Sequence, residues 1–128
     1  MQFGSMHYKL RKYLIETARQ KDKFAYYSDI VIDCGLHINL RSEHGRKQLT
    51  TLLGEVSEFE SSHGRPLISA MAIYKDSRRN DHGDGFYMVA EKLKKGSFKS
   101  LKYGLFGFTE AEACRKFWQV EENYLKFK

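Results

Sequence analysis

Apolar residues recur at helical spacing in two long segments of the chain. Within residues 8–20, charged side chains flank an apolar stripe at Leu10, Tyr13, Leu14, Thr17 and Ala18. Within residues 42–62 the stripe is longer, at Leu49, Leu52, Leu53, Val56 and Phe59. Because residues three and four positions apart share one face of a helix, both segments predict amphipathic helices. Ser42 is a favourable N-cap for the second helix.

Two shorter elements are predicted between these helices. Residues 24–27 are expected to form a very short strand. Ser28 can then cap a helix over residues 29–34, and Gly35 is suited to the left-handed conformation that ends a helix.

The only proline, Pro66, stands ahead of an apolar run at residues 67–74. Proline cannot continue a helix but fits a strand entrance, so the run predicts a strand. The following loop, residues 75–84, is polar and contains glycine. It is predicted to project Lys75, Arg78, Arg79 and His82 outward.

The last third of the chain predicts two more helices. The first covers residues 86–93, with Gly96 as its stop signal. Residues 99–108 alternate only in part and contain glycines, so a short strand and an extended loop both stay open. Thr109 and Glu112 form a capping-box pattern. It predicts a final helix with Ala113, Phe117, Val120 and Tyr124 on one face.

The order of the predicted elements is helix, short strand, helix, helix, strand and exposed loop. This is the order of a winged helix-turn-helix domain. With 128 residues available for one core, we predict a helix-rich α+β protein with a single winged-helix-like domain over residues 6–128. Residues 1–5, ahead of a second methionine at Met6, are interpreted as an appended leader outside the fold.

Composition is that of an ordered globular protein, with 41% hydrophobic and 30% charged residues. Cys34 and Cys114 are the only cysteines, and both occupy apolar periodic positions, which favours buried free thiols. No segment has the pattern of a secretory signal or a membrane span. These features predict a reduced, cytoplasmic protein without a membrane partner.

The formal charge of +6 favours encounter with polyanions such as nucleic acid. In a winged helix the third helix enters the major groove, and the loop contacts the flanking backbone. The candidate nucleic-acid-binding residues are therefore Arg46, Lys47, Thr50 and Thr51 on the long helix, with Lys75, Arg78 and Arg79 at the loop. The alternative is a plain solvated helix face and a charged turn, because Glu55, Glu58 and Glu60 follow on the same helix.

A second basic segment contains Lys92, Lys94, Lys95, Lys99 and Lys102, interleaved with Phe98, Tyr103, Phe106 and Phe108. Cations beside aromatic rings are typical of grooves that bind single-stranded nucleic acid. The same pattern is also typical of a solubilising helix end followed by core aromatics.

Catalytic and metal chemistry has weaker sequence support. A metal-dependent nuclease could use Glu55, Glu58, Asp76 and Lys75, and Glu60, Asp81 and Asp84 are further acids. Their spacing matches no known motif, and surface carboxylates are the alternative interpretation. We interpret the histidines at 44, 63 and 82 as turn residues and not as zinc ligands. Since phosphate loops, nucleophile elbows and dinucleotide fingerprints are absent, we predict no cofactor and no metal.

Two resemblances bear on these interpretations. The segments GRPLISAMAIYKD and GDGFYMVAEKL, preceded by LLGEVSEFE and followed by FW, resemble a family of small uncharacterised bacterial or phage proteins. This resemblance covers residues 8–118, and it implies a bacterial or phage origin without an activity. More loosely, Tyr26-Tyr27-Ser28-Asp29-Ile30 and the two helices after it are similar to the winged-helix part of alkyltransferase-like proteins. The reactive Pro-Cys-His-Arg run is missing, so only the fold analogy carries over.

The sequence thus favours a non-catalytic, regulatory DNA-binding protein whose partner is double-stranded DNA and which could act as a homodimer. A protein-interaction module, a regulator or inhibitor presenting residues 75–84, is the alternative hypothesis. A metal-dependent nuclease is the third.

Overall fold

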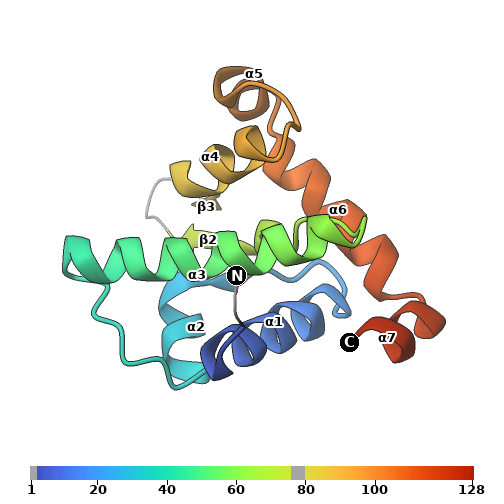
Figure 1. The fold of residues 1–128 in the computed structure, drawn as a ribbon, viewed down its shortest axis with the longest axis horizontal. Helices are drawn as coiled ribbons and strands as arrows, with labels where there is room; N and C mark the ends of the chain where they lie inside the picture. The colour runs from blue at the N-terminus through green and yellow to red at the C-terminus, as the bar shows by residue number, and fades with distance from the viewer. Residues whose placement is uncertain (1–2, 76–79) are drawn as a thin grey trace.

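A computed structural model of the chain describes residues 3–75 and 80–128, and this part of the protein is helix-rich with a small sheet (Figure 1). The predicted α+β class is confirmed. The elements in chain order are α1 (Ser5–Ala18), β1 (Ala25–Tyr26), α2 (Tyr27–Asp33), α3 (Glu43–Ser62), the 3-10 helix η1 (Ile68–Met71), β2 (Ala72–Lys75), β3 (Asn80–Asp81), α4 (Asp84–Lys92), α5 (Phe98–Tyr103), α6 (Phe106–Trp118) and α7 (Glu121–Phe127).

The core is centred on η1, all of whose residues are buried. Helices α1, α3 and α6 pack around it. In Figure 1, α4 and α5 lie above α3, while α1 and α2 lie below it. The apolar stripes of α1 and α3 face inward as predicted, because burying them removes their side chains from water.

Local signals at the ends of α3 are confirmed. The hydroxyl of Ser42 accepts a hydrogen bond from the amide of Gly45 at 2.9 Å. The helix ends at Ser62, and Gly64 has a φ of 71°. Gly35, after α2, likewise has the predicted left-handed φ, at 62°. Glycine reaches this region without the steric cost of a Cβ atom.

The start of α2 differs from the prediction. The helix begins at Tyr27, with Tyr26 in the N-cap position and without a side-chain capping bond to the helix, so Ser28 is not the cap. The Tyr27 ring is buried and meets the Tyr74 ring edge-on, with centroids 4.1 Å apart. This tertiary contact, which local sequence does not encode, accompanies the earlier start.

The predicted strand over residues 67–74 is wrong in its first half. Only Ala72–Lys75 form β2, and Ile68–Met71 form η1. The partner strand β1 has two residues, so earlier residues have no ladder to join. Side chains satisfy their amides instead: Glu110 accepts from Leu67 N at 2.9 Å, and the Ser57 hydroxyl accepts from Ser69 N at 2.9 Å.

The sheet of the described residues has the strand order β1-β2-β3. Strand β1 runs parallel to β2, with Ala25 opposite Ala72. Strand β3 runs antiparallel to β2, with Tyr74 opposite Asp81. The β2 and β3 strands therefore form a hairpin around residues 76–79, which lie outside the described residues.

The prediction for α4 is confirmed, but its stop comes before Gly96. The helix ends at Lys92, and Lys94 takes a φ of 63°. Residues 99–108 are neither strand nor extended loop, and both expectations are wrong. The hydroxyl of Ser97 accepts from Ser100 N at 3.2 Å and opens α5, and Gly104 follows its last residue.

The final helix is also different from the prediction. Helix α6 begins at Phe106, so Thr109 lies inside it and no capping box opens there. Helix α6 ends at Trp118, and α7 is a separate helix. After this end, the Gln119 side-chain amide donates to Ala18 O at 3.0 Å. Val120 is consequently exposed instead of lying on an apolar face.

Residues ahead of Met6 take part in the packing. Helix α1 begins at Ser5, and the ring of Phe3 lies 4.6 Å from that of Phe59 on α3. Residues 3–5 therefore belong with the packed part of the chain, and the interpretation of residues 1–5 as an appended leader stays a prediction. Both cysteines are free and buried, as predicted. Among the described residues, no helix is long and apolar enough to cross a membrane.

Candidate nucleic-acid interface

The amino-terminal half of α3 begins in a tight junction with the loop before it. A Cβ atom on Gly45 would lie 1.9 Å from the carbonyl oxygen of Asn39, so only glycine fits between helix and loop. Ser42 and Asn39 reinforce the junction, because the Ser42 hydroxyl donates to Asn39 O at 3.0 Å. The direction in which Arg46 and Lys47 leave the helix is thereby fixed.

Arg46 and Lys47 are both exposed, and neither is held by a strong ion pair with a described residue. One terminal nitrogen of Arg46 donates to the carbonyl oxygens of Leu40 and Arg41, each at 3.1 Å. The Lys47 ammonium lies 3.8 Å from Glu43, but both side chains are 78% exposed. A pair so solvated contributes little free energy, so the charges of both residues stay accessible to a ligand.

The four predicted residues of α3 do not share one face. A helix turns about 100° per residue, so Lys47 and Thr51 point about 40° apart and Arg46 and Thr51 about 140° apart. Lys47 and Thr51 lie together on the solvent side. Arg46 instead points toward the loop at residues 40–41.

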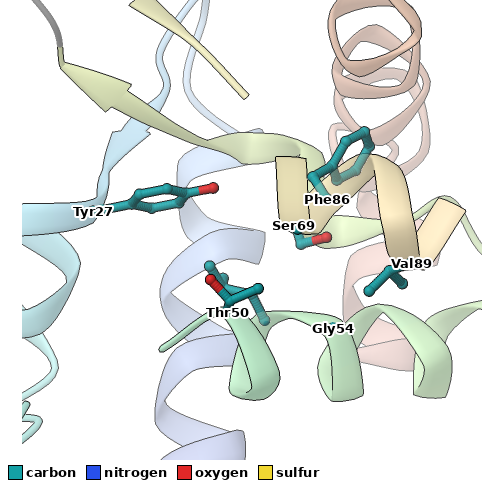
Figure 2. A pocket seen from close by; sticks show the side chains of 8 residues that line it. Tyr27, Thr50, Gly54, Ser69, Phe86 and Val89 are labelled. Atoms are coloured by element: carbon teal, nitrogen blue, oxygen red, sulfur yellow. The ribbon is translucent and has the colours of Figure 1, made fainter. Parts of the chain in front are cut away.

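Thr50 packs against α4 and is half-buried, so it is less accessible than the prediction for this residue assumes. A Cβ atom on Gly85 would lie 2.2 Å from the Thr50 methyl carbon, and one on Gly54 would lie 2.9 Å from Val89. Figure 2 shows Thr50 and Gly54 opposite Phe86 and Val89, with Tyr27 and Ser69 nearby. The cavity among these residues measures only about 10 Å³, close to the smallest that holds one water.

An open groove of about 470 Å³ runs between α3 and α4 on the solvent side of this contact. Thr51, Glu55 and Glu58 line it from α3, and Met88 and Lys92 line it from α4. The Lys92 ammonium donates to Glu58 at 2.7 Å, and this carboxylate raises the pKa of Lys92. The groove therefore carries mixed charge.

The acids of the carboxyl-terminal half of α3 have separate basic partners. Glu55 lies 3.1 Å from His7, and Glu58 pairs with Lys92. Glu60 is completely buried and accepts from Arg11 Nε at 2.7 Å and from Arg65 Nε at 2.5 Å. Among the described residues, no group of three or more His, Cys, Asp or Glu side chains could hold a metal ion.

The buried Glu60 cluster was missed by the sequence analysis, which read the acid as a surface carboxylate. Both guanidinium groups also lie over the Phe59 ring, at 5.4 Å for Arg11 and 5.5 Å for Arg65. A signal was present in the spacing. Glu60 continues the register of Leu49, Leu53 and Val56, so it falls on the buried stripe.

Lys75 closes β2 and is exposed, with its ammonium 5.4 Å from the centroid of the Tyr26 ring. In Figure 1 the carboxyl end of β2 and the amino end of α3 both point to the left of the view. Arg78 and Arg79 lie outside the described residues, as does Asp76 of the nuclease hypothesis.

The histidines at 44, 63 and 82 do not converge. His44 and His63 stand at opposite ends of α3, roughly 28 Å apart at the helical rise of 1.5 Å per residue. The prediction that His82 projects outward is wrong, because its side chain is buried. The rings of Phe24, Phe86, Tyr87 and Phe108 surround it.

His82 ties the end of the hairpin to η1. Its Nε2 lies 2.6 Å from the carbonyl oxygen of Ala70, and a carbonyl only accepts, so Nε2 carries the proton. In the part of the chain that the structure describes, Nδ1 has no hydrogen-bond partner; Asp81 Oδ1 lies 3.8 Å away. Burial lowers the pKa of His82.

Comparison of the chain with protein-family models, curated proteins and solved structures finds no match in any of the three. The resemblance to a small bacterial or phage family and the looser likeness to alkyltransferase-like proteins therefore stay predictions.

Proposed function

We propose that this protein binds double-stranded DNA without catalysing a reaction on it, as a protein of winged-helix type. In this proposal the amino-terminal half of α3 enters the major groove, and the β2–β3 hairpin contacts the flanking backbone. Lys47 and Thr51 face the base edges, while Arg46, Lys75, Arg78 and Arg79 contact phosphates.

One observation carries this proposal: the cations at the amino-terminal end of α3 are exposed and weakly paired, whereas the acids farther along have basic partners. Among the described residues, Arg46 donates to backbone carbonyls alone, and the Lys47–Glu43 pair is highly solvated. Glu58 and Glu60 pair with lysine and arginine cations, which reduces the repulsion these two acids would exert on phosphate. The element order α1-β1-α2-α3-η1-β2-β3 supports the same assignment, with η1 as an addition between the long helix and the hairpin.

The salt dependence of duplex binding tests the proposal. The logarithm of the affinity falls linearly with the logarithm of salt concentration, by about 0.9 per phosphate contact. Fluorescence anisotropy with a labelled duplex should give a slope that decreases by about one unit in Arg46→Ala and again in Lys75→Ala, because both residues are assigned to phosphates. Lys12→Ala, which removes the same charge from an exposed position on α1, is the matched control.

A slope unchanged by both Arg46→Ala and Arg78→Ala contradicts the proposal. Thr51→Ala should relax the preference between duplex sequences with little effect on the salt slope, because base contacts and phosphate contacts act differently. Sedimentation of the complex gives its stoichiometry, and two chains on one duplex would support the homodimer.

The protein-interaction module remains the second candidate, on the evidence of exposed apolar side chains near the hairpin and α4. Met88 is 63% exposed beside the mixed-charge groove, and Tyr74 on β2 is exposed as well. Pull-down from a nuclease-treated bacterial lysate separates the candidates. A partner that survives nuclease treatment and is lost in Met88→Lys favours the interaction module, whereas loss on nuclease treatment favours DNA binding.

A further inference from the structure

The corner between α4 and α5 presents three lysines without acidic partners. Lys94, Lys95 and Lys99 are exposed, and none has an ion pair with any described residue. The neighbouring Lys92 and Lys102 differ, because they donate to Glu58 at 2.7 Å and to Asp84 at 2.6 Å. In Figure 1 this corner lies at the top of the molecule, far from α1 and α2.

The backbone of the corner is fixed by local contacts. Lys94 and Gly96 have φ values of 63° and 147°, which turn the chain sharply between the helices. A Cβ atom on Gly96 would lie 3.1 Å from the Leu101 side chain, so the turn packs closely on α5. The nearby Glu91 carboxylate accepts from Phe98 N at 2.7 Å and is thus engaged with the backbone of α5. The lysines therefore project from a turn whose backbone conformation is held by these contacts.

Tyr103 adds an exposed aromatic ring to these charges. It is 80% exposed and makes no contact with another aromatic ring of the described residues, whereas Phe98 and Phe106 pack against Tyr87 and Phe86. Tyr103 follows Lys99 by four positions in α5, so the ring and the ammonium group share one face of the helix. An exposed ring beside cations can offer stacking and phosphate contact together.

We propose that this α4–α5 corner binds single-stranded nucleic acid, with Tyr103 stacking on a base and Lys94, Lys95 and Lys99 contacting phosphates. A single strand fits better than a duplex, because duplex bases already stack on each other and offer no free face to the ring. It also fits better than a protein, because lysine is depleted in protein interfaces. This surface is distinct from the amino-terminal half of α3 and does not depend on it.

Anisotropy titrations of the full chain test the proposal, with a labelled oligothymidylate of about 12 nucleotides, within the usual site sizes. Tyr103→Ala should weaken single-strand binding on the order of tenfold, and Tyr103→Phe should retain it. Replacing all three lysines by alanine should lower the salt slope by about two units, given about 0.7 per contact on a single strand. Tyr8→Ala and Lys9→Ala, at exposed positions on α1, are the matched controls.

The duplex of the same length and a polyglutamate peptide complete the design. Tyr103→Ala should leave duplex binding unchanged, while Arg46→Ala lowers it, so the two proposals fail separately. The α4–α5 proposal is overturned if oligothymidylate does not bind, or if Tyr103→Ala binds it like the unaltered protein. It is also overturned if polyglutamate displaces the strand from the unaltered protein and from Tyr103→Ala equally, since the corner would then attract any polyanion.

Discussion

The two halves of α3 use charge in opposite ways. In the carboxyl-terminal half, Glu60 is 0% exposed and sits between two arginines. In the amino-terminal half, Arg46 and Lys47 are exposed to solvent and have only weak partners among the described residues. A buried charge must be matched inside the fold, whereas an exposed one can be matched by a ligand. This contrast supports the proposal that the first half of α3 binds a ligand, whereas the charges of the Glu60 cluster are matched inside the fold.

The largest expected effect is in the buried half. Glu60→Gln leaves the Arg11 and Arg65 guanidinium groups without their carboxylate, and losing one partner of a buried ionic cluster costs about 3–5 kcal/mol. Urea unfolding of the full chain measures this loss. Glu58→Gln is the control, because its pair with the exposed Lys92 should be worth at most about 1 kcal/mol. Equal losses in the two variants would remove the contrast between the halves.

A smaller effect is expected where Thr50 meets α4. Gly85→Ala places a methyl group against the Thr50 methyl, and overpacking of this kind costs about 1–3 kcal/mol. Thr50→Ser removes that methyl and should restore stability in the double variant. Thr51→Ser, on the exposed stripe, should not restore it. Denaturant unfolding of Gly85→Ala and of its two double variants, with Thr50→Ser and with Thr51→Ser, checks the assignment. A rescue by Thr51→Ser alone would contradict it.

The pH dependence of stability probes His82, whose hydrogen bond to the carbonyl oxygen of Ala70 ties the end of the hairpin to η1. Burial lowers the folded pKa of His82 below its ordinary 6.5, so the unfolded chain binds more protons at low pH. The contribution of neutral His82 to the free energy of unfolding is complete above pH 6.5. It is lost as the pH falls toward the pKa of His82 in the folded protein. Its slope is at most about 1.4 kcal/mol per pH unit.

His82→Gln should therefore flatten the stability profile between pH 7.5 and pH 5, as measured by unfolding at each pH. His44→Gln, at an exposed position on α3, should leave the profile as it is. A profile that is identical in the unaltered protein and in His82→Gln would show that the buried imidazole is not the titrating group.

The smallest effect is expected in the exposed half. Lys47→Ala and Thr51→Ala should each change the free energy of unfolding by no more than about 0.5 kcal/mol, because neither side chain packs in the core. Thermal and denaturant unfolding both measure this change. A loss above about 1 kcal/mol would show that the amino-terminal half is also a structural element.

The sequence predicted those parts of the fold whose signals are local. The stripe of α3, its Ser42 cap and the left-handed Gly35 and Gly64 depend on neighbouring residues only. The prediction of a strand over residues 67–74 was wrong in its first half because the pairing depends on the short β1. Local sequence does not specify the length of a distant partner strand. Helix α5 was missed because it is short and its apolar pattern is weak, although Ser97 is a local N-cap signal for its start.

The candidate site was predicted only in part, for a related reason. Arg46, Lys47 and Thr51 are exposed because they fall off the apolar stripe, which the sequence displays. Thr50 also falls off that stripe, yet α4 covers it through Gly85, a tertiary contact without a local signal. His82 sits in a glycine-flanked turn that reads as exposed, but aromatic residues from distant segments enclose it.

Amide chemical-shift mapping by NMR during titration with duplex DNA tests the central claim most directly. The proposal predicts that the largest changes fall at residues 43–51 and at Lys75, with small changes at residues 55–62. Changes concentrated at residues 55–62, or no changes on α3 at all, would contradict it.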